Sequence, residues 1–376
     1  MKSLCISGPT LRSNGQIVPS TLRIEQGKIV SIEDDITNNA DIISKGVIAP
    51  GFIDLQVNGG YGEDFTDNPQ AIIPVAARLP ETGVTAFLPT RITSALTSYP
   101  DWLRTAEEAA QQVKGAQVLG FHLEGPFFNL AKKGAHNPAL VYSEIDLAVL
   151  DSYAGSSMVK IVTLAPELPG AIEAIGYLRK KGIIVSAGHS NATFDQAQAG
   201  FQTGIGWGTH LFNAMSEFKQ REPGLPGALL TAPIACGLIA DGIHVHPAAL
   251  RIAWLSKGSQ GITLVTDCMA AMGMAPGVYR LGTAGAVTVD HSTARLADGT
   301  LAGSIATMDQ CVRLMHTLSG CPLADALIMA STTPADLLGL SHKGRLAPGC
   351  DADVVVLDEE MKVQMTIIGG EVIYQN

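Results

Sequence analysis

VLGFHLEGP, residues 118–126, is a short apolar run that ends in a carboxylate and is followed at once by Gly and Pro. An apolar run of this length between such residues is typical of a buried strand. A carboxylate at the carboxyl end of a strand, here Glu124, lies at the rim of a sheet, where α/β enzymes place their chemistry. Glu124 alone fits a cap on the next element equally well, and the ends of the other strands decide between the two.

Similar apolar runs recur along the middle of the chain, at 52–58, 84–90, 159–165, 183–189, 205–210, 236–241 and 262–267. The segments between them, such as 100–113 and 168–181, carry helix-forming residues with apolar positions three or four apart. Strands that alternate with helices predict a parallel sheet, and eight such units predict a closed (β/α)₈ TIM-like barrel. An open doubly wound sheet is the alternative, but no G-x-G-x-x-G motif follows the first strand.

Both ends of the chain have the pattern of β structure. Residues 21–25 and 28–32 alternate apolar and polar side chains across Gln26-Gly27, which predicts a hairpin. Strands are also expected at 353–357, 363–368 and 371–374. Each segment is too short for a core of its own, so we expect a small β-sandwich domain from residues 1–48 and 345–376, beside a barrel of residues 49–344. Two independent edge extensions are the alternative.

Composition narrows the class of protein. The 376 residues are 46% hydrophobic and 16% charged, which is typical of a globular chain with a large core. A net charge of −10 argues against a nucleic-acid surface, and no apolar stretch is long enough to span a membrane. The six cysteines are scattered without a C-x-x-C pair, and Ser7-Gly8-Pro9 interrupts any signal peptide. We therefore expect a cytoplasmic protein with reduced thiols, without nucleic-acid or membrane partners.

Polar side chains stand at the ends of several expected strands. Glu124 ends the third, His189 the fifth, His210 the sixth and Asp267 the eighth. In a barrel these positions converge on one face although they are far apart in sequence. One histidine there is more often a hydrogen-bonded core residue, but four such groups together predict a metal site. Two His and one Glu leave a coordination position for water, and Asp267 would stand beside it as general base.

The chain resembles a known family at these residues. In order, it contains APGFIDLQVNGG, HLEGPF, KKGAHNP, SAGHSNAT, GTHLFNAM, REPGLPG, IADGIHVHP, LVTDCMAAMG, LAGS and, near the end, APGCDAD. Single motifs such as HLEGP or GHS are weak, whereas the ordered set is highly specific. The set resembles the N-acetylglucosamine-6-phosphate deacetylase family of the amidohydrolase superfamily, almost from end to end.

The resemblance implies a single-metal amide hydrolase. Glu124, His189 and His210 would hold one divalent ion, with zinc as the first expectation and iron, manganese or cobalt as alternatives. Asp267 would take a proton from the attacking water and give it to the leaving amine, and His136 would help to stabilise the oxyanion. Glucosamine 6-phosphate and acetate would be the products, in amino-sugar catabolism and cell-wall sugar recycling.

One position departs from the wider superfamily. Many amidohydrolases carry H-x-H at the end of the first strand and bind a second metal there. This chain has Gln56 and Asn58 at those positions. An amide is a poor ligand for a transition metal compared with imidazole, so the sequence favours one metal ion per subunit.

The resemblance also implies where the phosphorylated amino sugar binds. Arg221 and His244 would hold the phosphate, helped by backbone amides at Asn213 and Ala214, because a guanidinium suits a bidentate grip on phosphate oxygens. An isolated loop arginine such as Arg221 would otherwise be expected to be merely solvated. The sugar pocket would be lined by Ala135, His136, Leu301, Ala302 and Gly303. The family implies a homodimer, in which one of these phosphate-binding groups comes from the partner subunit. His122 and His246 are expected to be structural.

Two other functions are compatible with parts of the pattern. A deacetylase for the galactosamine 6-phosphate epimer would share every catalytic residue and differ only around the sugar hydroxyls. A non-catalytic, metal-free barrel with a regulatory or assembly role would be expected to have lost its ligand positions, yet Glu124, His189, His210 and Asp267 are all present.

Overall fold

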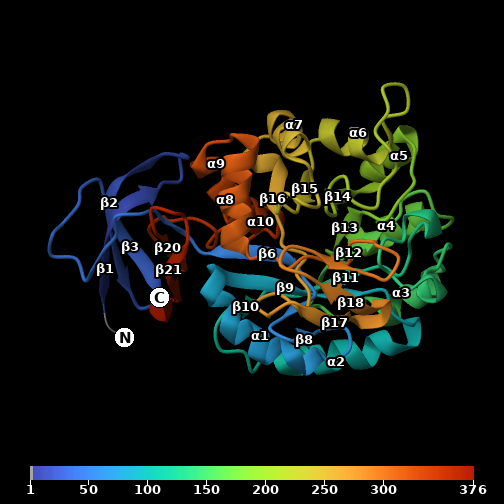
Figure 1. Cartoon of the computed structure of the whole chain (residues 1–376), viewed down its shortest axis with the longest axis horizontal. Helices are drawn as coiled ribbons and strands as arrows, with labels where there is room; N and C mark the ends of the chain where they lie inside the picture. Colours follow the sequence, from blue (N-terminus) through green and yellow to red (C-terminus); the bar gives the residue numbers. More distant parts are fainter. Residues whose placement is uncertain (1–2) are drawn as a thin grey trace.

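Strands from the beginning and the end of the chain form one sheet at one end of the molecule, blue and red in Figure 1. The computed structural model describes residues 3–376. The terminal sheet contains β1 (Leu4–Leu11), β2 (Ile17–Glu25), β3 (Lys28–Glu33), β4 (Ile42–Ile43), β5 (Ile48–Pro50), β20 (Val354–Leu357), β21 (Val363–Ile368) and β22 (Glu371–Gln375). Strand β5 joins the two segments, because it pairs with β1 in parallel and with β20 antiparallel. The predicted hairpin between β2 and β3 is confirmed, with Glu25 opposite Lys28.

The two terminal segments share one apolar core. Ile6, Leu22 and Ile24 from the first segment are buried against Val354 and Ile367 from the last. Neither segment could bury these side chains alone, and this explains why strands so far apart in sequence fold together. The β structure of the first segment extends to Pro50, two residues past the predicted boundary. The division of the chain into two domains stays a prediction.

Eight parallel strands form the barrel in chain order. They are β6 (Phe52–Val57), β9 (Val84–Ile92), β11 (Phe121–Glu124), β12 (Val159–Leu164), β13 (Ile184–Ala187), β14 (Ile205–Gly208), β15 (Ala235–Leu238) and β16 (Ile262–Leu264). A short β10 (Gln117–Val118) continues the line of β11 beside β9. The last strand meets the first where Asp267 N–H donates to Gln56 C=O at 2.9 Å and Asn58 N–H to Cys268 C=O at 2.8 Å. The predicted barrel is confirmed.

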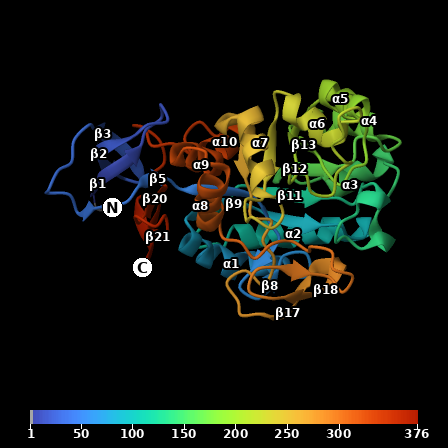
Figure 2. The same cartoon turned by 45° about the horizontal axis from the view of Figure 1, so that its top comes forward.

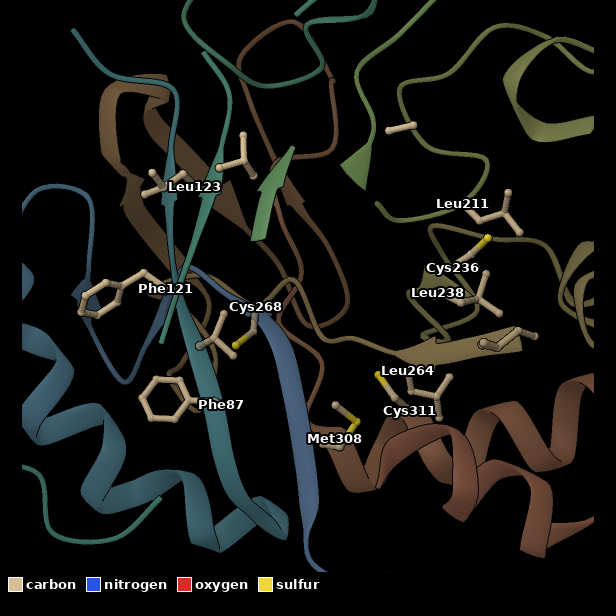
Figure 3. Packing of buried hydrophobic residues seen from close by; sticks show 14 of the residues in the cluster. Phe87, Phe121, Leu123, Leu211, Cys236, Leu238, Leu264, Cys268, Met308 and Cys311 are labelled. Atoms are coloured by element: carbon tan, nitrogen blue, oxygen red, sulfur yellow. The ribbon is translucent and has the colours of Figure 1, made fainter. Parts of the chain in front are cut away.

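Helices surround the barrel on its outside (Figure 2). They are α1 (Ile72–Arg78), α2 (Tyr99–Ala110), α3 (Leu150–Tyr153), α4 (Ala171–Lys180), α5 (Phe194–Thr203), α6 (Gly224–Thr231), α7 (Pro247–Lys257), α8 (Met308–Ser319), α9 (Leu323–Ala330) and α10 (Thr332–Leu337). Helices α2 and α4 correspond to the two segments named from the sequence. Figure 3 shows Met308 and Cys311 of α8 near Leu238 and Leu264 of the barrel strands, in the apolar layer between helices and sheet. Within residues 3–376, no helix has both the length and the apolar character needed to cross a membrane.

A small antiparallel sheet, which the sequence did not predict, follows the last barrel strand. It contains β17 (Gly277–Leu281), β18 (Gly285–Val289) and β19 (Ala294–Arg295), and it projects to one side of the barrel in Figure 2. Its inner face packs Leu281 and Val287 against Met269 and Ala302. The Gly282 N–H donates to Asp64 Oδ2 at 2.9 Å, in the loop that follows β6 and carries the short pair β7 (Gly59–Gly60) and β8 (Glu63–Asp64). The sheet therefore covers one edge of the carboxyl-end face.

Candidate active site

The polar strand-end residues meet in one pocket, as the barrel predicts. The pocket encloses about 220 Å³. Its walls include most of the residues expected from the sequence, namely Asn58, Glu124, Ala135, His136, His189, His210, Asn213, Ala214, His244, Asp267, Leu301 and Gly303. Ala302 is fully buried between two of these wall residues. Gln56 is also buried, and its amide contacts two wall carboxylates, Glu124 and Asp267.

Three of the site residues have left-handed backbone conformations. The φ angles are +49° at His189, +31° at His210 and +50° at Asp267. Residues other than glycine rarely adopt this region, and each such residue costs about 1–3 kcal/mol. Backbone hydrogen bonds hold the turns, including Ser304 N–H to Asp267 C=O and Asn129 N–H to His189 C=O. The chain thus bends sharply just after each strand, and the three side chains gather in the pocket.

Glu124, His189 and His210 have the spacing of ligands around one metal ion. The Oε1 atom of Glu124 lies 3.4 Å from His189 Nε2 and 3.1 Å from His210 Nε2, and the two Nε2 atoms are 3.1 Å apart. Zinc binds such donors at about 2.0–2.2 Å in a tetrahedron, which places neighbouring donors roughly 3.3–3.5 Å apart. The Nδ1–H of His189 donates to the Lys132 carbonyl at 2.9 Å, so the lone pair of Nε2 faces the cluster. The donor set therefore fits a divalent transition metal.

The surroundings of the two carboxylates separate their acidities. Burial would raise the pKa of Glu124, but the imidazoles of His189 and His210 beside it hold that pKa well below its usual value. Burial raises the pKa of Asp267 to about 7, and the negative charge of Glu124 adds to the shift. Glu124 thus remains an anion, whereas Asp267 can exchange a proton near neutral pH.

Gln56 and Asn58 act as hydrogen-bond donors to these carboxylates. The Gln56 amide donates to Glu124 Oε1 at 2.8 Å and to Asp267 Oδ1 at 3.1 Å. The Asn58 amide donates to the same Asp267 oxygen at 2.7 Å. The NH₂ groups face the acidic side chains, so the end of the first strand presents N–H groups here instead of a second pair of metal ligands.

His136 lies beside the cluster and is held by its other ring nitrogen. Its Nε2 is 4.0 Å from Glu124 Oε2, while its Nδ1 is 2.9 Å from the hydroxyl of Thr93. Burial and the neighbouring His189 lower the pKa of His136 to about 3, so the ring is neutral. Phe128 packs edge-on against His136 and stacks on His189 at 4.2 Å between ring centroids. This apolar ring keeps both imidazoles in place.

His244 and Arg221 occupy different places. His244 lines the pocket, and its Nδ1 lies 2.6 Å from Asp241 Oδ2, which fixes the ring. Arg221 is exposed and lines a separate hollow with Lys132 and Thr193. It belongs to the loop before α6, whose tip is closed by paired backbone hydrogen bonds between Lys219 and Glu222. The structure therefore does not bring Arg221 into the pocket of its own chain.

The remaining histidines contact the protein itself. The ring of His122 is buried in the barrel, with Nδ1 3.1 Å from the Leu55 carbonyl and Nε2 2.7 Å from Thr163 Oγ1. His246 caps the first turn of α7 through the Ala248 N–H. Both contacts agree with the structural role expected from the sequence.

Several residues near the chemistry were missed from the sequence. Thr93 follows β9 directly, so its position at a strand end was available, but a threonine there carried no chemical signal. Leu281 and Thr300 line the pocket from the unpredicted sheet and the loop after it. Asp241, which holds His244, lay in a quoted motif without an assigned role. Thr93 could have been found from its position at the end of a strand, whereas Leu281 could be placed at the pocket only once the fold was known.

Comparison with known proteins places the chain among characterised relatives. Residues 47–373 match the amidohydrolase family. The chain is 46% identical to the N-acetylglucosamine-6-phosphate deacetylase of Bos taurus over 88% of this chain and 84% of that one. It is 36% identical to the enzyme of that name from Bacillus subtilis (strain 168), over 99% and 98%.

A solved structure agrees over the whole chain. A mutant N-acetyl-D-glucosamine-6-phosphate deacetylase from Mycobacterium smegmatis, in complex with N-acetyl-D-glucosamine-6-phosphate, matches with a TM-score of 0.91 at 34% identity. The match covers 100% of both chains. Since the strand-end groups form one pocket in a fold shared from end to end with these proteins, the chain belongs to the amidohydrolase family, among the N-acetylglucosamine-6-phosphate deacetylases.

Proposed function

We propose that this protein hydrolyses the acetamide of N-acetyl-D-glucosamine 6-phosphate, releasing D-glucosamine 6-phosphate and acetate in amino-sugar catabolism and cell-wall sugar recycling. The observation that carries the proposal is the pocket in which Asp267, with a pKa near 7, stands beside the donors Glu124, His189 and His210. The relatives named for this reaction, at 36–46% identity over most of the chain, support the choice of substrate.

Glu124, His189 and His210 would hold one divalent ion, with zinc preferred and iron, manganese or cobalt as alternatives. When bound, such an ion polarises a carbonyl oxygen and makes water more acidic. The spacing of the three donors supports a single ion, as do the amides of Gln56 and Asn58, which donate hydrogen bonds to Glu124 and Asp267.

The proton transfers belong to Asp267. Its carboxylate takes a proton from the water that attacks the acetamide carbon, and the same proton then passes to the sugar nitrogen as the C–N bond breaks. Gln56 and Asn58 both donate to Oδ1, which fixes the carboxylate and leaves Oδ2 for this exchange. His136 donates a hydrogen bond to the acetamide oxygen as negative charge develops there.

Substrate recognition divides between sugar and phosphate. Ala135, Leu301 and Gly303 would contact the sugar, with Ala302 buried behind them. His244, held by Asp241, and the backbone amides of Asn213 and Ala214 would bind the phosphate. This part of the proposal is supported by the pocket, whose wall contains Ala135, Asn213, Ala214, His244, Leu301 and Gly303.

We also propose that Arg221 serves the pocket of a second subunit in a homodimer. Its exposed position on the loop before α6, in a hollow separate from its own pocket, supports this arrangement. A cytoplasmic location is supported by the six free cysteines, because reducing compartments keep thiols unpaired.

Acetate release tests the proposal. The protein, stripped of metal, is assayed with the 6-phosphates of N-acetylglucosamine and N-acetylgalactosamine, before and after addition of zinc, iron(II), manganese or cobalt. We expect release from the glucosamine substrate only after metal is restored. Equal or faster release from the galactosamine epimer would contradict the choice of sugar. No release with any metal would favour the non-catalytic alternative.

A further inference from the structure

We propose that Thr93 is a positioning residue that fixes the tautomer of His136, and thereby decides that this histidine is a hydrogen-bond donor and not a fourth metal ligand. The effect of Thr93 on catalysis rests on the proposed function. Its structural part concerns two ring nitrogens and can be tested without any turnover.

His136 is close enough to the cluster for ligation to be a real alternative. Donor atoms of Glu124, His136 and His189 all lie within 4.8 Å of one another. The three residues are also equally enclosed, with 5% or less of each residue exposed. Burial therefore does not separate His136 from His189, and their Nε2 atoms lie at the similar distances of 4.0 and 3.4 Å from Glu124. The protonation of each Nε2 must decide which of the two can bind a metal.

The partners of the Nδ1 atoms differ in kind between the histidines. His189 Nδ1 faces the Lys132 carbonyl, which only accepts, so its proton is on Nδ1 and Nε2 keeps a lone pair for a metal. His136 Nδ1 faces the backbone N–H of Thr93 at 3.3 Å, which only donates, and the Thr93 hydroxyl at 2.9 Å. A neutral ring that accepts at Nδ1 must carry its proton on Nε2.

A proton on Nε2 has two consequences in the pocket. An N–H group has no lone pair to offer a metal, so His136 stays outside the ligand set although it lies beside Glu124. The same N–H can donate to an acetamide oxygen as that atom gains negative charge, whereas the other tautomer would oppose it with a lone pair. Thr93 and the Lys132 carbonyl thus give the imidazoles of His136 and His189 opposite tasks.

Thr93 itself is held by the small sheet that follows the barrel. It is fully buried, and its carbonyl accepts a hydrogen bond from the hydroxyl of Thr283 at 2.5 Å. Thr283 lies in the 3₁₀ turn η8 (Gly282–Ala284) between β17 and β18. The preceding Ile92 N–H donates to Thr66 Oγ1 at 3.1 Å. The peptide that carries the decisive N–H is therefore fixed on both sides.

The direct test is the tautomer of His136 by NMR. The protein is labelled with ¹⁵N-histidine, the His136 signals are assigned by their loss in His136→Asn, and long-range ¹H–¹⁵N correlations show which nitrogen carries the proton. We expect the Nε2–H form in both metal-free and zinc-loaded protein. A proton on Nδ1, or a metal-shifted Nε2 in the zinc-loaded protein, would overturn the proposal whether or not the enzyme turns over this substrate.

Paired variants test the role in the reaction. Thr93→Val removes the hydroxyl, and Thr93→Ser retains it as the matched control. One hydrogen bond of this kind corresponds to roughly 2- to 12-fold, so we expect kcat to fall by that factor in Thr93→Val, with little change in KM or bound metal. Thr93→Ser should keep nearly wild-type kcat and the Nε2–H signal. Equal kcat in the two variants, or equal losses in both, would show that the Thr93 hydroxyl does not position His136.

A second pair separates the donor role from ring shape. In His136→Gln the side-chain amide nitrogen reaches close to the place of Nε2, whereas in His136→Asn it lies nearer Nδ1. We expect His136→Gln to retain more activity than His136→Asn, with equal metal content. The opposite order would contradict donation from Nε2.

Discussion

At the scale of single residues, Gln56 links the two carboxylates that perform different tasks. Its amide NH₂ donates to both Glu124 and Asp267, so the proposed metal ligand and the proposed base are held in a fixed relation. The neighbouring imidazoles keep the pKa of Glu124 low, whereas burial and then the charge of Glu124 raise the pKa of Asp267. Glu124 contacts the imidazoles of His189 and His210, whereas Asp267 Oδ1 accepts hydrogen bonds from the amides of Gln56 and Asn58.

Asp267→Asn should keep the fold and the metal while losing most turnover, because an amide cannot accept the proton of water. General acid–base contributions are typically about 10²–10⁴-fold, and we expect kcat to fall within that range. Steady-state kinetics together with metal analysis measure both quantities. A variant with nearly wild-type kcat would show that another group is the base.

Metal content gives the second prediction. Glu124→Ala, His189→Ala and His210→Ala should each lower bound metal and activity together, because the three donors complete one site. Gln56→Ala is the control, since its amide donates hydrogen bonds but supplies no ligand, and it should retain about one ion per chain. Elemental analysis of the purified proteins decides the matter, and two firmly bound ions in the wild type would refute a single site.

Arg221 gives a prediction about recognition without chemistry. Hydrogen bonds to a charged phosphate would exist in ground and transition states alike, so their loss raises KM more than it lowers kcat. Arg221→Ala should weaken use of the phosphorylated substrate roughly 10- to 150-fold, the equivalent of about 1.5–3 kcal/mol. Slow hydrolysis of unphosphorylated N-acetylglucosamine should hardly change. Equal losses on both substrates would place the phosphate site elsewhere.

Mixed subunits test which chain supplies Arg221. When inactive Asp267→Asn protein is exchanged with Arg221→Ala protein, a mixed dimer contains one pocket with an intact base and an intact arginine from the partner subunit. At low substrate concentration, we then expect the mixture to be more active than the two proteins assayed separately and added together. If the arginine served its own pocket, mixing would restore nothing.

Much of the site could be predicted because its residues combine an unusual side chain with a strand-end position. Glu124, His189, His210 and Asp267 are rare in apolar runs, so each stands out in the sequence. Thr93 is an ordinary residue just after a strand, and its role depends on which way a peptide N–H points. No sequence pattern encodes that direction, and it became visible only in the folded chain.

At the scale of elements, the hairpin of β17 and β18 connects the pocket wall to its support. Leu281 lines the pocket, and the next two residues, Gly282 and Thr283, bond to Asp64 and Thr93. The sheet has its own apolar contacts with Met269. It therefore behaves as part of the site although it lies outside the barrel.

Gly282→Ala should displace this hairpin. The residue has φ +39°, and a Cβ there would lie 2.7 Å from Thr66 Cβ, closer than real contacts allow. Gly339→Ala is the matched control, since it has φ +70° with nothing within 4 Å of the added atom. Both variants strain the backbone, but overpacking should lower the free energy of unfolding of Gly282→Ala by about 1–3 kcal/mol more. KM should rise only in Gly282→Ala. Urea unfolding and kinetics measure both, and equal behaviour of the two variants would contradict a steric role.

The barrel strands were predictable, and the strands that were missed share a physical reason. Barrel strands are buried on both faces, so they are continuous apolar runs that stand out from the helices between them. Strand β1 contains Ser7-Gly8-Pro9, which resembles a turn. Only glycine fits at position 8, because a Cβ there would lie 2.7 Å from the Ser44 carbonyl oxygen. Strands β17 and β18 are short and partly exposed, and so gave little periodic signal.

At the scale of the whole molecule, a buried lysine joins the terminal sheet to the end of the barrel. Lys343 Nζ lies 2.7 Å from Asp353 and 2.9 Å from Asp351, and the Asp353 carbonyl accepts the Gly51 N–H between β5 and β6. Burial lowers the pKa of Lys343, but these carboxylates more than offset that effect and raise it above its usual 10.5. The stabilisation is therefore complete below pH 10.5 and is lost as the pH rises further.

Lys343→Met should destabilise the protein by about 3–5 kcal/mol, because Asp353 is left buried without its cation. Lys362→Met is the control, since its pair with Glu360 is more than half exposed on both sides and should change little. Urea denaturation at pH 7 and pH 11 compares them. The difference between Lys343→Met and wild type should shrink at pH 11, and an undiminished difference would assign the loss to packing alone.

Strand β5 pairs with β20, so the terminal sheet can form only late in the synthesis of the chain. The sheet cannot close until the ribosome has added everything between Pro50 and Val354, which takes roughly 15–60 s at about 5–20 residues per second. During that time Ile6, Leu22 and Ile24 have no partner from the last strands. The N-terminal segment must therefore be kept from aggregation, by chaperones or by provisional contacts with the nascent barrel, until translation reaches the strands that cover it.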